Sequence, residues 1–278
     1  MNKFIILFVL TLNFSFAQDS NHLEINQEFK IDQIVYLFGD NVKLRNSPSV
    51  DSDVVKLLTI GEPLRIIEKS SESFVYNGIN SPWYKVEHNN QQGYVVGGLI
   101  SIVEKKANNV RFLFATEMVE ENLYIITRVL INSKTEYFEN KSEFLGSNYG
   151  FKINLYNNRG VKSIDNILFI NYLPESCGAN SGGYYLFLDS NNLYKVIDVF
   201  SSADIGFWES ENLIFPNDSK GEKDKIIYFQ EHGQYSEMDD LENEPTWEKT
   251  STTKVNLKWV NNALQPNPKT ITKNLNKE

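Results

Sequence analysis

The chain has 278 residues, and 27 Lys and Arg stand against 36 Asp and Glu, so its formal net charge is −9. This charge argues against a nucleic-acid partner, because phosphate binding depends on Lys and Arg. A single cysteine and three histidines exclude an internal disulfide and a zinc finger, and we expect no cofactor.

The first residues have the pattern of an export signal. Lys3 precedes an apolar run from Phe4 to Leu12, and small residues follow at Ser15 and Ala17. This order predicts a signal peptide over 1–17 that is cleaved after Ala17. We therefore expect a periplasmic or secreted protein. No later run is long and apolar enough to predict a transmembrane segment.

Short runs rich in β-branched and aromatic residues follow a polar lead-in at 18–32. They are separated by Gly, Pro, Asn and Ser, which is typical of strands in a small all-β unit. We predict that this unit spans 33–103, with strands near 35–38, 54–58, 63–68, 83–87 and 93–98. The polar segment 104–109 is predicted to be a linker.

Longer runs of the same kind predict a second β-rich domain over 110–262. The clearest hairpin lies at 183–200, where two such runs flank Ser190-Asn191-Asn192, and Asn tolerates the backbone of a tight turn. No segment keeps an apolar 3.6-residue period over three turns. We expect an all-β protein in which the second domain is an antiparallel meander closed into a barrel or sandwich. The polar tail 263–278 is predicted to be disordered.

An ordered set of motifs lies inside the first unit. Val42-Lys43-Leu44-Arg45 precedes a turn at Ser47-Pro48, Trp83-Tyr84-Lys85-Val86 forms a later strand, and Gly93-Tyr94-Val95 closes the set. These motifs resemble the bacterial SH3 domain family over residues 33–103. The chain departs from the family pattern at Ser47, at Tyr94 and in a longer loop before Trp83, and these changes concern a ligand groove more than the fold.

The resemblance implies a non-catalytic module that binds peptidoglycan, another envelope component, a peptide or a protein partner. Aromatic rings stack on sugars and pack on peptide stems, so Trp83, Tyr84 and Tyr94 are candidate ligand-binding residues. Arg45 is a fourth candidate, with a role in the turn as the alternative. The alternative is that these rings simply fill the core of a small barrel. For Trp83 we favour this packing role over ligand contact.

An alternative function is a cell-wall hydrolase that uses a cysteine nucleophile. Such an enzyme needs a histidine that takes the thiol proton, and His232 follows Cys177 by 55 residues. The context disagrees, because a predicted strand at 184–188 follows Cys177 where the family of cysteine peptidases has a helix. An unpaired loop thiol is the other interpretation.

The negative charge is concentrated in residues 209–248, which contain twelve acidic residues and three lysines. Within it, Asp239, Asp240, Glu242 and Glu244 offer oxygen ligands of the kind calcium prefers, although the order of an EF-hand loop is missing. A third hypothesis is that this acidic surface makes the second domain an interaction or inhibitor module for a basic protein partner.

Overall fold

The computed structural model describes residues 22–132, 136–235 and 247–275. Most of these residues lie in strands of antiparallel sheets and very few lie in helices, which confirms the predicted all-β class. The export signal 1–17 and the acidic residues 237–244 lie outside the described residues. Within the described ranges, no helix has the length and apolar character needed to cross a membrane.

The first unit is a six-stranded sheet in the order β1-β4-β5-β6-β2-β3, and η1 is a short 3₁₀ helix that follows it. Its inward-facing side chains form one core that includes Leu44, Tyr84 and Val86. The bounds are β1 Ile34–Tyr36, β2 Val42–Arg45, β3 Val54–Leu58, β4 Pro63–Tyr76, β5 Ile79–His88, β6 Gln91–Val96 and η1 Gly97–Leu99.

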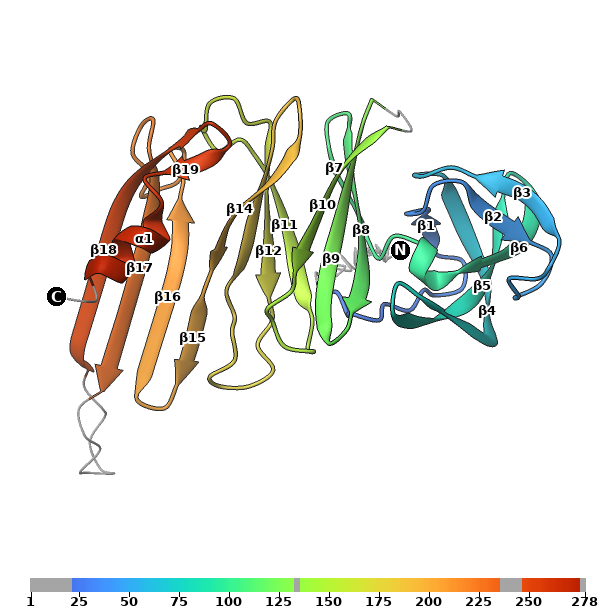
Figure 1. Cartoon of the computed structure of the whole chain (residues 1–278), viewed down its shortest axis with the longest axis horizontal. Coiled ribbons are helices and arrows are strands. Elements are labelled where there is room, and N and C mark those ends of the chain that lie inside the picture. Colours follow the sequence, from blue (N-terminus) through green and yellow to red (C-terminus); the bar gives the residue numbers. More distant parts are fainter. Residues whose placement is uncertain (1–21, 133–135, 236–246, 276–278) are drawn as a thin grey trace, which may run out of the picture.

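Three further antiparallel sheets are stacked beside this unit (Figure 1). The first sheet has the order β10-β9-β8-β7, the middle sheet β11-β12-β13-β14 and the last sheet β15-β16-β17-β18-β19. The strands of the first and middle sheets are β7 Glu104–Ala107, β8 Val110–Val119, β9 Asn122–Ile131, β10 Tyr137–Glu143, β11 Phe151–Asn157, β12 Asn166–Tyr172, β13 Gly183–Leu188 and β14 Leu193–Val199. The last sheet contains β15 Ser201–Asp204, β16 Phe207–Ile214, β17 Ile226–Tyr235, β18 Trp247–Val260 and β19 Ala263–Gln265, and the helix α1 Pro268–Leu275 follows it.

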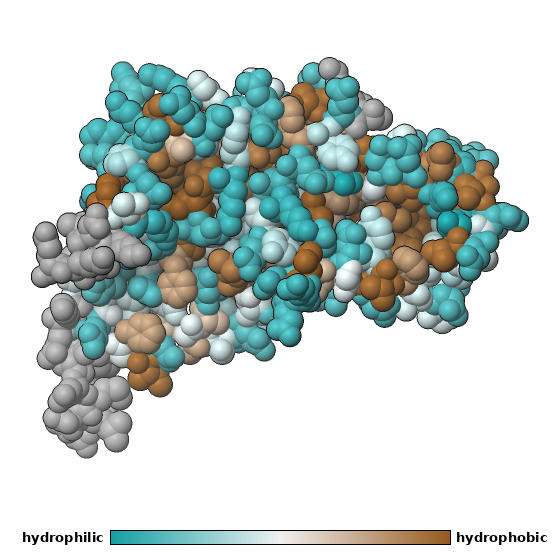
Figure 2. All heavy atoms as spheres, in the orientation of Figure 1, coloured by the Kyte–Doolittle hydropathy of each residue, from teal (hydrophilic) through white to brown (hydrophobic). Residues whose placement is uncertain are grey.

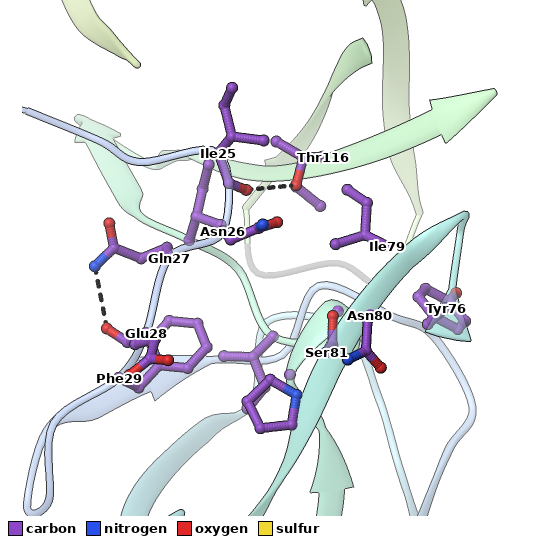
Figure 3. A pocket seen from close by; sticks show the side chains of 16 residues that line it. Ile25, Asn26, Gln27, Glu28, Phe29, Tyr76, Ile79, Asn80, Ser81 and Thr116 are labelled. Atoms are coloured by element: carbon purple, nitrogen blue, oxygen red, sulfur yellow. Dashed lines mark hydrogen bonds between the residues drawn. The ribbon is translucent and has the colours of Figure 1, made fainter. Parts of the chain in front are cut away.

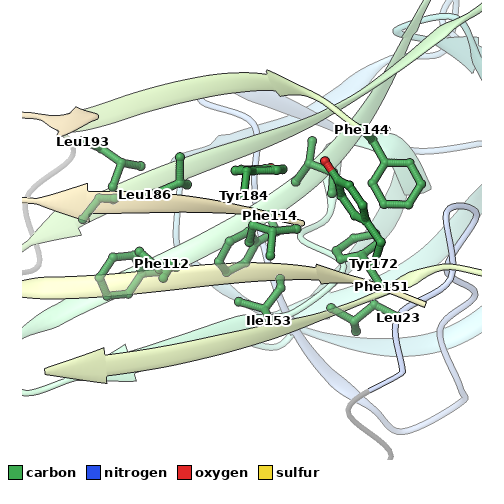
Figure 4. Packing of buried hydrophobic residues seen from close by; sticks show 14 of the residues in the cluster. Leu23, Phe112, Phe114, Phe144, Phe151, Ile153, Tyr172, Tyr184, Leu186 and Leu193 are labelled. Carbon is green, nitrogen blue, oxygen red and sulfur yellow. The ribbon is translucent and has the colours of Figure 1, made fainter. Parts of the chain in front are cut away.

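The two central strands of the middle sheet, β12 and β13, are buried on both faces. Alternate side chains of a strand point to opposite faces, and those of β13 enter two different cores: Tyr184 and Leu186 pack against the first sheet, and Tyr185 and Phe187 pack against the last. Figure 4 shows the first of these cores, where Phe112 and Phe114 meet the middle sheet. The second domain is therefore a sandwich of three layers, and the predicted 183–200 hairpin is the β13–β14 pair.

The first sheet also packs against the SH3-like unit. Leu113, Ala115, Ile126 and Leu130 leave its other face and form a core with Phe38 and Ile60. On the face drawn in Figure 2, hydrophobic residues appear in separate groups divided by hydrophilic ones.

Two predicted segment assignments were wrong. Residues 104–107 are not a linker but strand β7, which pairs with β8 from Glu104↔Leu113 to Ala107↔Val110. The 263–278 tail was predicted to be disordered, but 263–265 pair with β18 and 268–275 form a helix. Polar composition was misleading in both places, because an edge strand or a surface helix needs only one buried face.

Candidate functional site

Two of the candidate ligand-binding rings are buried. Trp83 is 3% exposed and Tyr84 is fully buried in the core of the first unit. The Tyr84 hydroxyl accepts a hydrogen bond from the backbone N–H of Phe29 at 3.2 Å, and the two rings meet edge to face at 5.3 Å. Burial raises the pKa of the Tyr84 phenol. Burial of both rings therefore argues against ligand contact by Trp83 and Tyr84, and it agrees with packing, the reading that the sequence favoured for Trp83.

Arg45 and Tyr94 lie side by side, on strands β2 and β6. The Arg45 guanidinium donates to the carbonyl oxygen of Ser52 at 2.6 Å, so it holds the turn that follows β2. Tyr94 is half-buried and is the most accessible of the three candidate rings. The structure thus gives Arg45 a structural contact and leaves Tyr94 as a candidate contact.

A cleft opens where the lead-in, the first unit and the first sheet meet (Figure 3). Its volume is about 210 Å³, and we refer to it as the seam cleft. Residues 25–29 form one wall, and 79–82 at the start of β5 form another. Gly97 and Gly98 lie at its base, and a Cβ on Gly98 would stand 2.9 Å from the Tyr76 ring, so glycine is what permits this close approach.

The lead-in is held across both units, although its composition is polar. Leu23 exchanges backbone hydrogen bonds with Phe151 of the middle sheet at 2.9 and 3.1 Å. The Thr116 hydroxyl then donates to the carbonyl of Ile25 at 3.1 Å, and the Phe29 side chain enters the core of the first unit. One wall of the seam cleft is thus a tied segment with a defined position.

The lining of the seam cleft combines amide groups with apolar surface. Asn26 and Asn80 are exposed, Gln27 is half-buried, and Ile79 and Pro82 supply apolar contacts. Glu28 also lines the cleft, and its carboxylate pairs with Lys69 at 2.5 Å. That hydrogen bond is the main cause of a raised Lys69 pKa. This set of groups suits an extended peptide, which presents amides and small side chains in alternation.

A second hollow of about 600 Å³ shares four lining residues with the seam cleft, namely Ile25, Asn26, Ile79 and Asn80. It continues to His22 and Tyr149, whose rings lie 5.0 Å apart. Asn80 is exposed and lines both hollows, so a substitution at this position would affect a ligand in either one.

Cys177 and His232 do not form a catalytic pair. The N–H of Gly178 bonds to Ala203 of β15, and β16 lies between β15 and β17, which carries His232. At about 4.8 Å per strand, the two residues are on the order of 14 Å apart. Ser251, rather than a thiol, lies 2.9 Å from Nδ1 of His232. Cys177 is exposed in a loop.

The predicted calcium ligands Asp239, Asp240, Glu242 and Glu244 lie outside the described residues. Among the residues that the structure describes, no group of three or more His, Cys, Asp or Glu side chains is arranged to hold a metal ion.

Sequence reasoning missed the lead-in residues and Asn80. The available signal was the apolar series Leu23, Ile25 and Phe29 within the polar segment, since an isolated large apolar residue in a polar lead-in often anchors it to a core.

Comparison with known families bears on the first unit alone. Residues 40–101 match the family model described as bacterial SH3 domain. No curated protein and no solved structure gave a significant match to the chain. The matched range contains β2 to β6 and η1, which is the part of the chain that carries the predicted motifs. Residues 40–101 therefore form a bacterial SH3 domain, a family of binding modules often associated with the cell wall.

Proposed function

We propose that this is an exported, non-catalytic protein of the periplasm or the extracellular space, and that its SH3 domain binds peptidoglycan or a peptide of the cell envelope in the seam cleft. Export is supported by the pattern of residues 1–17. The binding role is supported by the family match, and the absence of catalysis by the separation of Cys177 from His232.

The observation that carries the proposal is the composition of the seam cleft. A tied segment of chain forms one wall, so that wall does not have to become ordered when a ligand enters, and the entropic cost of binding is lower. Amide side chains beside Ile79 and Pro82 match a ligand with alternating amide and methyl groups, as in a peptide stem.

The test is co-sedimentation of residues 18–278 with purified peptidoglycan, together with binding of a soluble stem peptide. Asn80→Trp places a large ring where the two hollows meet, and we expect it to weaken binding at least about fivefold, which corresponds to about 1 kcal/mol. Asn191→Trp is the matched control, because Asn191 is exposed in the β13–β14 turn, far along the chain from the cleft.

Three outcomes separate the possibilities. Loss of binding in Asn80→Trp and not in Asn191→Trp supports the seam cleft. Loss in Tyr94→Ala with normal binding in Asn80→Trp rejects the seam cleft and places the site at the Tyr94 face. If the unaltered protein binds neither peptidoglycan nor the peptide, the envelope ligand is wrong.

A further inference from the structure

A second pocket lies in the three-layer domain, at a distance from the SH3 domain, and it gathers positive charge in a negatively charged chain. Its volume is about 210 Å³, and it lies between the β11–β12 loop, the loop before β17 and the end of β18. Lys162, Lys225 and Lys258 line it together with one carboxylate, that of Asp224.

The local charge is opposite in sign to that of the chain. Lys162 pairs with Asp224 at 2.7 Å, and Lys225 pairs with Glu222 at 2.5 Å. No salt bridge of Lys258 is found among the described residues, but its ammonium, like that of Lys223, interacts electrostatically with Asp224. Among the residues that line the pocket, three lysines thus accompany one carboxylate, that of Asp224, which leaves a local excess of two positive charges.

The inner part of the pocket is apolar. Val161, Ile226 and Leu257 belong to the core between the middle and last sheets and close the pocket from below. Trp259 forms a wall, and its indole is held 5.0 Å from the Phe187 ring. A ligand that entered would therefore place an apolar body on these residues and a charged group among the lysines.

The two loops that form the pocket are fixed to each other. Asn217 donates its N–H to the carbonyl of Arg159 at 3.0 Å, and the Arg159 guanidinium forms an ion pair with Asp218. The same guanidinium lies 4.9 Å from the Phe215 ring. A Cβ on Gly160 would stand 2.6 Å from Asn217, so the loops touch at this point. The pocket is preorganised, and ordering it costs little on binding.

We propose that this pocket binds a small amphiphilic anion, with a phosphate or carboxylate head among Lys162, Lys225 and Lys258 and an apolar body against Val161, Leu257 and Trp259. Charge-assisted hydrogen bonds from lysine ammonium groups suit either head, and the apolar floor favours a ligand with an alkyl or aromatic part over a free inorganic anion. The site is independent of the one proposed for the SH3 domain.

The experiment uses residues 18–278 and four probes: hexyl phosphate, hexanoate, hexanol and inorganic phosphate. Binding is followed by amide chemical shifts in two-dimensional NMR, which locate the site, and by the titration of those shifts. We expect hexyl phosphate or hexanoate to shift the amides of 160–162 and 258–260. We also expect at least one of these two probes to bind about tenfold more tightly than both hexanol and inorganic phosphate.

A charge-matched pair of variants tests the lysines. Lys162→Gln/Lys258→Gln is expected to weaken binding of the amphiphilic anion about tenfold, with little change for hexanol. Lys43→Gln/Lys152→Gln removes the same charge from exposed positions on β2 and β11 and is expected to leave binding within about twofold. Thermal unfolding of both variants checks that they are folded.

The relative affinity of hexyl phosphate and hexanoate identifies the head group, and either order supports the proposal. Four results would overturn it. These are equal affinity for hexanol, equal affinity for inorganic phosphate, equal loss in both double variants, and shifts confined to other parts of the chain.

Discussion

Replacement of Arg128 by alanine tests whether the SH3 domain and the first sheet unfold as one unit. Arg128 belongs to β9, yet its guanidinium donates to the carbonyl oxygen of Phe38 at 2.7 Å and covers the Phe38 ring at 4.4 Å. It also covers the ring of Tyr137 at 4.5 Å and pairs with Glu139 at 2.7 Å. Its side chain is 18% exposed, so solvent screens these contacts only in part.

The magnitude follows from these contacts. A hydrogen bond from a charged donor to a buried carbonyl contributes about 1.5–3 kcal/mol. Each ring face adds about 0.5–1 kcal/mol, and the partly exposed ion pair adds at most about 1 kcal/mol. These contributions overlap, because the same guanidinium makes all of them. We therefore expect Arg128→Ala to lower the free energy of unfolding by about 3 kcal/mol, which corresponds to a fall of about 6–12 °C in melting temperature.

The assay is denaturant unfolding followed by hydrogen exchange in peptides from 40–101 and from 110–235. Both sets should lose protection together, since the core of Phe38 and Ile60 with Leu113 and Leu130 joins the two units. Arg128→Lys keeps the charge but loses the planar stacking, and we expect an intermediate effect. A loss below about 1 kcal/mol, or a loss of protection confined to one set of peptides, would refute the reasoning.

Two further predictions concern single contacts. Gly78 and Gly206 both have positive φ, but a Cβ on Gly78 would lie 2.1 Å from the Met118 carbonyl, whereas Gly206 has nothing within 4 Å. Gly78→Ala should therefore cost about 1–3 kcal/mol more than Gly206→Ala in chemical denaturation, and equal costs would contradict the close approach. The hydrogen bond from Lys162 is the first cause of a lowered Asp224 pKa, so Lys162→Gln should raise that pKa in an NMR titration. Because the folded-state pKa is depressed, the stabilisation by this pair is present above the ordinary pKa of Asp and disappears as the pH falls through the lowered value. An unchanged Asp224 pKa would exclude the pairing.

The SH3 domain was predictable from sequence because each of its strands buries one face. In Trp83-Tyr84-Lys85-Val86, period-two alternation separates Tyr84 and Val86, which fill the barrel core, from Trp83 and Lys85 on the other face. Alternation says which side chains share a face, but it does not say what covers that face. Trp83 is buried although it lies outside the barrel core, so the alternation alone did not show that the face of Trp83 is covered.

The stacking of the three sheets in the second domain could not be predicted for the same reason, since a strand pattern does not show which element covers each face. All six residues of β13, Gly183–Leu188, are buried, and a continuous apolar run predicts a strand with two covered faces. It does not identify the covering sheets, because those include β8 and β18, which lie roughly 60 to 80 residues away in sequence on either side. The seam cleft was missed for a related reason. Its walls come from the lead-in, β5 and the first sheet, and no local motif joins residues 25–29 to Asn80 and Thr116.

The charge of the chain shows most clearly how tertiary structure redistributes a sequence property. Residues 209–248 sum to −9, which predicts a negative surface throughout the segment. However, exposed charges act over roughly 8 Å at physiological ionic strength. At that range Lys223 and Lys225 of the segment are joined by Lys162 and Lys258, which lie outside it in sequence, and the local excess becomes positive. The proposed anion pocket thus uses Lys225 of the acidic segment together with lysines from outside it. A basic protein partner would instead contact the acidic side chains of the segment, so the two hypotheses concern different surfaces.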